Sequence, residues 1–152
     1  MEWVETTAKT VDDGLKKQVR SGALRAVEAD RRRSRLELTT DVERMAGADL
    51  VVEAATENMD LKKKIFRDLD THCPEKTILA TNTSSISITE IAAVTNRPAK
   101  VIGMHFMNPV PVMKLVEVIK GLATSEETFT LTWDLCTKFG KTPAEANDFP
   151  GF

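Results

Sequence analysis

The sequence predicts an α/β fold built around a mostly parallel sheet, and three observations support this prediction. Short apolar runs typical of buried strands alternate along the chain with segments of helical periodicity. Polar residues follow three consecutive strand-like runs, at the position where sheets of this class bind ligands. The 152 residues are enough for one domain with a hydrophobic core.

The first half of the chain predicts two helices, two short strands and a turn. Thr10 and Asp13 resemble a capping box, which places a helix start at Val11. A strand is expected over residues 35–39, a helical turn from Asp41, a strand over 49–55 and a helix over 58–73. The predicted apolar face of this last helix holds Leu61, Ile65, Phe66 and Leu69. Its predicted polar face holds Lys62, Lys63, Lys64 and Arg67.

The second half continues the alternation. Residues 77–80 predict a buried strand, and Ser87 with Glu90 predicts the capped start of a short helix. Residues 101–105 and 115–119 predict two further strands. Thr124 with Glu127 predicts the start of a last helix, which ends at Gly140 because glycine commonly terminates helices.

Composition argues against several functional classes. The chain is 41% hydrophobic and 29% charged with a net charge of −2, so neither nucleic acid nor an anionic membrane is an expected partner. It has no run long enough to span a membrane and no secretory signal, so we expect a cytoplasmic protein. Cys73 and Cys136 are expected to be buried free thiols, and no motif predicts a metal site.

The most informative segment runs from Gly103 to Glu117 and reads GMHFMNPVPVMKLVE. His105 ends one apolar run and Glu117 is embedded in the next, with a proline-containing turn between them. A carboxylate inside an apolar run needs a partner, and His105 is the economical one. A histidine held by a glutamate is suited to act as a base. The alternative is a structural histidine beside a glutamate that reaches solvent.

Polar residues at three strand ends predict a site on one rim of the sheet. Glu57 and Asn58 follow the strand over 49–55, residues 82–85 follow the next, and His105 and Asn108 follow the third. Taken one at a time, such residues more often form turns and caps. Their convergence on one rim favours a binding or catalytic function.

Three segments, DLVVEAATEN, ATNTSSISITEIA and GMHFMNPVPVMKLVEVIKG, resemble the NAD-dependent L-3-hydroxyacyl-CoA dehydrogenases, including those of the 3-hydroxybutyryl-CoA dehydrogenase type. The resemblance runs from about residue 36 to residue 152. It implies a doubly wound, Rossmann-like sheet, NAD as cofactor and an acyl-CoA substrate in fatty-acid or butanoate metabolism. It also implies interconversion of 3-hydroxyacyl-CoA and 3-ketoacyl-CoA.

The resemblance implies a role for each matching residue. His105 corresponds to the base that takes the proton of the substrate 3-hydroxyl group, and Glu117 to its orienting partner. Ser84 corresponds to a serine that hydrogen-bonds the reacting oxygen and approaches the nicotinamide. The remaining cofactor-binding positions are Asn82 and Asn108, near the nicotinamide, and Ala54, Glu57 and Lys62, on the ribose or nicotinamide side.

Two parts of the family pattern are absent from the sequence. The seven glycines are scattered, so there is no Gly-rich loop to hold the pyrophosphate. The sequence also ends at DFPGF, where the family continues into a helical dimerisation domain. We therefore expect residues 1–152 to form a truncated, partial dinucleotide-binding domain. Its unpaired strand edges are expected to favour association with a second copy.

Two other functions remain open at this stage. The chain could be an inactive binding or interaction module derived from such a domain, which the missing Gly-rich loop favours. A hydrolase using Ser84 and His105 is the weaker alternative, because no GxSxG motif surrounds the serine.

Overall fold

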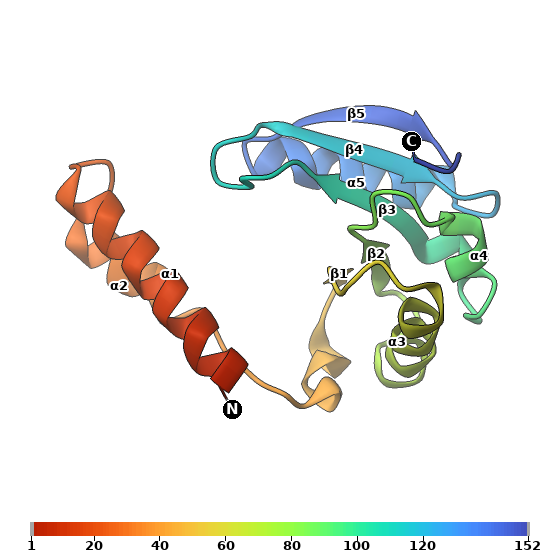
Figure 1. The fold of residues 1–152 in the computed structure, drawn as a ribbon, viewed down its shortest axis with the longest axis horizontal. Helices are drawn as coiled ribbons and strands as arrows, with labels where there is room; N and C mark the ends of the chain where they lie inside the picture. The colour runs from red at the N-terminus through yellow and green to blue at the C-terminus, as the bar shows by residue number, and fades with distance from the viewer. Residues whose placement is uncertain (1, 152) are drawn as a thin grey trace. The chain divides into compact units, whose positions relative to one another are not determined.

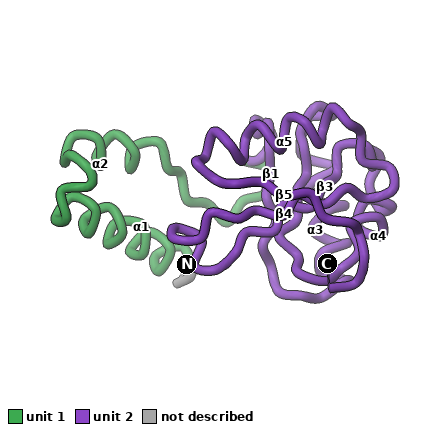
Figure 2. Tube along the Cα trace, turned by 90° about the horizontal axis from the view of Figure 1, so that it is seen from above, with its two compact units in different colours: residues 1–44 green, residues 45–152 purple. Residues whose placement is uncertain are grey.

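The computed structural model describes residues 2–151, so Met1 and Phe152 of the predicted domain lie outside the described residues. The chain divides into two compact units, Met1–Arg44 and Met45–Phe152 (Figure 2). The first unit is helical, and the second contains the whole sheet. The predicted α/β class with a mostly parallel sheet is confirmed.

The first unit holds the helices α1 (Glu2–Arg20) and α2 (Ala26–Arg33). The predicted start at Val11 is wrong, because α1 continues through Thr10, whose hydroxyl donates to the Thr6 carbonyl within the helix. The predicted strand over 35–39 does not form. An alternating apolar pattern forms a strand only when a neighbouring strand completes its hydrogen bonds, and the described sheet offers none there.

The 3-10 turn η1 (Val42–Gly47) spans the boundary between the units and agrees with the turn predicted from Asp41. The sheet of the second unit has the order β1-β2-β3-β4-β5 (Figure 1). The strands are β1 (Leu50–Glu53), β2 (Ile78–Thr81), β3 (Val101–Phe106), β4 (Leu115–Lys120) and β5 (Thr142–Asn147). Neighbouring strands are parallel except for β3 and β4, which are antiparallel.

The sequence did not predict β5, whose residues TPAEAN lack the β-branched and aromatic side chains enriched in strands. It forms the edge of the sheet, where a proline such as Pro143 is tolerated. Pairing with the full length of β4 therefore overrides the weak local preference.

Helices cover both faces of the sheet. α3 (Met59–His72) and α4 (Ile88–Ala92) pack on one face through a cluster that includes Phe66 and Ile91. α5 (Glu126–Lys138) packs on the other face, where Cys136 meets Met104 of β3 in a second cluster. The short η2 (Pro98–Lys100) precedes β3. Layers on both faces are the doubly wound arrangement that the sequence predicted.

Of the caps predicted at Thr10, Ser87 and Thr124, only the one at Ser87 is confirmed. Asn58 accepts from the amide of Leu61 to cap α3, and Ser87 caps α4. Ser125, not Thr124, caps α5, because the Thr124 hydroxyl instead donates to the Val101 carbonyl.

Two further expectations can be compared with the described residues. Cys73 and Cys136 are buried free cysteines, as predicted. None of the described helices is long and apolar enough to cross a membrane.

Candidate active site

The antiparallel hairpin of β3 and β4 places His105 directly opposite Glu117. The Nδ1 atom of His105 lies 2.7 Å from Oε2 of Glu117, and both side chains are largely buried, at 16% and 22% exposure. An ionised carboxylate only accepts hydrogen bonds, so Nδ1 of His105 carries the proton in the neutral ring. This leaves the lone pair of Nε2 available as a base.

Ser84 lies on the other side of the imidazole. Its Oγ is 2.9 Å from Nε2 of His105, and Ser84 itself is exposed. With the lone pair on Nε2, the Ser84 hydroxyl is the donor in this contact. Ser84, His105 and Glu117 therefore form a continuous line of hydrogen bonds from the surface to a largely buried carboxylate.

This line resembles a hydrolase triad, but the backbone around Ser84 does not suit that chemistry. A hydrolase uses the amide after its nucleophile to stabilise an oxyanion. Here the amides of Ser85 and Ile86 both donate to Oγ1 of Thr83, at 3.3 and 3.0 Å. These amides are already occupied, which weighs against an oxyanion hole and against a nucleophilic Ser84.

Glu57 holds the residues on both sides of Ser84. Its Oε2 accepts from Oγ1 of Thr83 at 2.6 Å and from Oγ of Ser85 at 3.4 Å. Glu57 comes from the loop after β1, so the ends of β1 and β2 are joined here. Its side chain is 42% exposed, which leaves part of the carboxylate open to a ligand.

A buried ion pair lies beneath Glu57. The ammonium group of Lys62 is fully buried and donates to both carboxylate oxygens of Glu53, at 2.8 and 3.0 Å, and to the Ala55 carbonyl. Thr81 donates to the second Glu53 oxygen at 2.7 Å. Lys62 also lies 3.8 Å from Glu57. Lys62 was assigned to the polar face of its helix, and this assignment is wrong, because it packs inward while Leu61 is 39% exposed.

The other predicted cofactor-binding residues are Asn82, Ala54 and Asn108. Oδ1 of Asn82 accepts from the amide of Phe106, which fixes the start of the loop that carries Ser84. Ala54 and Asn108 are both exposed, Ala54 after β1 and Asn108 in the turn after β3. The structure therefore brings Ser84, His105, Glu117, Glu57 and Asn82 together and leaves Ala54 and Asn108 on the rim.

Glu53 is a site residue that the sequence analysis did not single out. The clue that identified Glu117, a carboxylate within an apolar run, also applied to Glu53 in DLVVEAA. Among the described residues, no group of three or more His, Cys, Asp or Glu is arranged to hold a metal ion.

A family model described as 3-hydroxyacyl-CoA dehydrogenase, NAD binding domain, matches residues 1–149. The match extends the resemblance noted from residue 36 through both helices of the first unit. A probable 3-hydroxybutyryl-CoA dehydrogenase of Bacillus subtilis is 53% identical over 151 residues, which are 99% of this chain and 53% of the relative. A 3-hydroxybutyryl-CoA dehydrogenase of Clostridioides difficile is 50% identical over 143 residues, or 93% of this chain and 50% of the relative.

Solved structures show the same similarity. The crystal structure of 3-hydroxybutyryl-CoA dehydrogenase from Escherichia coli K12 superposes with a TM-score of 0.97 at 44% identity, covering 100% of this chain and 32% of that chain. The (S)-3-hydroxybutyryl-CoA dehydrogenase from Ralstonia eutropha gives a TM-score of 0.95 at 43% identity, covering 98% and 53%. The chain thus spans about half the length of the curated relatives it matches.

Proposed function

Because this chain belongs to the family of 3-hydroxyacyl-CoA dehydrogenase NAD-binding domains, we propose that it serves an oxidoreductase that interconverts 3-hydroxyacyl-CoA and 3-ketoacyl-CoA. We propose 3-hydroxybutyryl-CoA as the substrate, since the relatives quoted above carry that name. The observation that carries the proposal is the hydrogen-bonded line of Ser84, His105 and Glu117.

The residues at the ends of β1 and β2 fit the nicotinamide half of NAD. The exposed part of the Glu57 carboxylate can accept hydrogen bonds from ribose hydroxyls, beside exposed Ala54 and Ser84. Lys62 is buried, so we expect it to act on the cofactor through Glu57. Asn82 and Asn108 flank the same rim. No Gly-rich loop for the pyrophosphate occurs in residues 1–152.

When bound, NAD supplies the acceptor for the hydride that leaves C3 of the substrate. The Nε2 atom of His105 accepts the proton of the 3-hydroxyl group in the oxidation direction. Ser84 donates to the same oxygen and keeps it within reach of Nε2. Glu117 holds the ring and stabilises the imidazolium that forms, as a buried carboxylate does for a catalytic histidine in other enzymes.

The test is oxidation of NADH by the purified chain in the presence of acetoacetyl-CoA, followed by absorbance at 340 nm. We expect His105→Gln to lower kcat by roughly 100-fold or more, which is the scale of general acid–base catalysis. His72→Gln is the matched control, because His72 lies on α3 and its ring contacts the Asp68 carbonyl instead. Equal activity of wild type and His105→Gln would refute the assignment of the base.

A binding or interaction module derived from such a domain is the second candidate function. Fluorescence titration of NADH onto the same proteins separates the two. Binding of NADH without turnover of acetoacetyl-CoA would support the module, whereas turnover that depends on His105 would support the dehydrogenase.

A further inference from the structure

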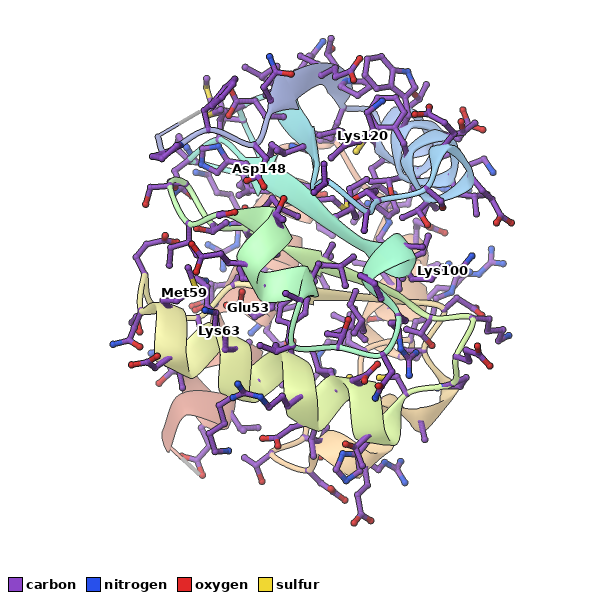
Figure 3. The ribbon with its side chains drawn as sticks, turned by 90° about the vertical axis from the view of Figure 1, so that its right-hand side faces the viewer. Glu53, Met59, Lys63, Lys100, Lys120 and Asp148 are labelled. Atoms are coloured by element: carbon purple, nitrogen blue, oxygen red, sulfur yellow. The ribbon has the colours of Figure 1, made fainter. Side chains whose placement is uncertain are left out.

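Asp148 follows directly after β5, and its carboxylate lies at the start of α4 (Figure 3). One oxygen accepts from the amide of Ile88 at 2.8 Å. The other accepts from the amide and hydroxyl of Thr89, at 2.9 and 2.6 Å, and from the hydroxyl of Ser87 at 3.1 Å. Both oxygens are thus used, and all four donors belong to the first turn of one helix.

This arrangement is more than a local helix cap. Ser87 already caps α4 by accepting from the amide of Glu90. α4 has five residues, and a helix this short depends on tertiary contacts to persist. Asp148 supplies those contacts from directly after β5, about 60 residues further along the chain.

The hydrogen bonds of Asp148 also connect to the turn after β4. The Thr89 hydroxyl that donates to Asp148 accepts from the amide of Leu122. In the same turn, a Cβ added to Gly121 would lie 3.1 Å from the amide nitrogen of Thr89, so the two backbones are in close approach. Asp148 therefore fixes the start of α4 against three separate segments: β5, the turn after β4 and the loop before α4.

The loop over residues 82–87 has anchors at both ends, and Ser84 lies between them. Glu57 holds Thr83 and Ser85, the two neighbours of Ser84, at the start and middle of the loop. Asp148 holds Ser87, three positions after Ser84, at the end of the loop. Ser84 is exposed and has little packing of its own, so the anchors determine where its hydroxyl lies.

The geometry points to Asp148 as a positioning residue that holds the loop over 82–87, and with it the Ser84 hydroxyl, against Nε2 of His105. Asp148 acts on Ser84 through its hydrogen bonds to Ser87, Ile88 and Thr89. The purpose of this positioning rests on the proposed dehydrogenase function, but the contact it controls can be measured without turnover.

The charge of Asp148 supports this role. Burial raises the pKa of Asp148, but hydrogen bonds from Thr89, Ile88 and Ser87 outweigh it, so the pKa lies below its usual value. The carboxylate is therefore ionised at neutral pH, and hydrogen bonds to an ionised acceptor are roughly twice as strong as neutral ones. Asparagine at this position would have the same shape but would turn an NH₂ group towards donors.

The experiment is NMR of the ¹⁵N-histidine-labelled chain, which contains two histidines, so His72 serves as an internal reference for His105. Ser84→Ala defines the shift of the Nε2 resonance that follows loss of the hydroxyl. We expect Asp148→Asn to move this resonance in the same direction by more than half of that shift, with His72 unchanged. The double variant Ser84→Ala/Asp148→Asn is expected to show the same shift of the Nε2 resonance as Ser84→Ala alone.

Asp70→Asn is the matched control for lost stability. Asp70 also accepts several hydrogen bonds, from Asn96 and Arg97, but at the far end of α3. If Asp148→Asn lowers Tm as Asp70→Asn does and leaves the His105 resonances at their wild-type positions, the positioning role is overturned.

Thr89→Val covers the case in which Asp148→Asn does not fold, because it removes one of the four hydrogen bonds to the carboxylate, together with the bond that Thr89 accepts from Leu122. We expect a smaller shift of the His105 resonance in the same direction, and no shift would overturn the proposal. In the activity assay we expect Asp148→Asn to lower kcat by about tenfold with little change in KM for NADH, less than the ~100-fold loss that misplacing a reacting group can cause. If Asp148→Asn shifts the His105 resonance but the wild-type chain shows no turnover, the positioning role of Asp148 is supported and the proposed function is contradicted.

Discussion

Replacing Lys62 by methionine should be among the most destabilising single substitutions in this protein. The Lys62 side chain is 0% exposed and that of Glu53 is 2% exposed, and the ammonium group donates to both carboxylate oxygens. Methionine has a similar volume and is apolar, so the substitution removes the charge with little change in packing. Glu53 would keep its bonds from Thr81 and the amide of Ala55, but its charge would be buried and uncompensated.

Breaking a buried ion pair from one side costs about 3–5 kcal/mol, which is a large part of the ~5–15 kcal/mol that stabilises a typical domain. In urea, with an m-value of roughly 2 kcal/mol/M, this loss lowers the midpoint by about 1.5–2.5 M. The matched control is Lys76→Met. Lys76 pairs with Asp49 on the surface, at 74% and 85% exposure, and its removal should cost less than ~1 kcal/mol.

The assay is equilibrium urea unfolding at neutral pH, followed by circular dichroism. The double variant Lys62→Met/Glu53→Gln removes both charges and should be more stable than Lys62→Met alone. A loss below ~1 kcal/mol for Lys62→Met would refute the reasoning, because that is the size expected of an exposed pair. A double variant no more stable than the single one would show that the buried charge of Glu53 is not the cause of the loss.

Three further predictions concern other parts of the fold. Burial raises the pKa of Asp70. Hydrogen bonds from Asn96 and Arg97 and the charge of Arg97 lower it by more, so the folded pKa lies below the unfolded value. Its contribution to stability is therefore complete above about pH 4 and is lost as the pH falls through the folded pKa; acid titration should show the stability difference between wild type and Asp70→Asn shrinking in that range. Burial raises the pKa of the Cys73 and Cys136 thiols. A thiol reagent at pH 8 should therefore react slowly with the native protein and fast with the protein unfolded in urea, and a rapid reaction with the native protein would contradict this. Val52 is 38% exposed on β1, which pairs with β2 alone in the described sheet, so Val52→Lys should reduce self-association in sedimentation velocity; wild type that sediments as a monomer at high concentration would argue against edge pairing.

The His105–Glu117 pair could be predicted from the sequence because both residues interrupt apolar runs that neighbour each other along the chain. A polar group embedded in an apolar run is costly unless it has a partner. The hairpin pairs each of these residues with the other, which is the nearest such group along the chain. The strands with apolar runs and the helices with side-chain caps were predicted for similarly local reasons. The edge strand β5 was not, because its pairing with β4 is a property of the assembled sheet.

Lys62 and Asp148 show the limit of local patterns. Periodicity counts apolar residues and therefore placed Lys62 on the polar face, although its true partner, Glu53, lies on a strand packed behind the helix. Asp148 follows a segment with no strand pattern, and its partners on α4 are about 60 residues away. Long-range partners of charged groups depend on the full topology, which the sequence pattern of either segment does not contain.

The antiparallel pairing of β3 and β4 sets the order in which the site can assemble as the chain leaves the ribosome. His105 and Glu117 are 12 residues apart, so their contact closes a short loop and can form early. Ser84 and His105 are 21 residues apart, and Asp148 and Ser87 are 61 apart. The acid–base pair can thus exist in a nascent chain well before the loop that carries Ser84 is locked. Release of Asp148, directly after β5, is then the event that locks this loop.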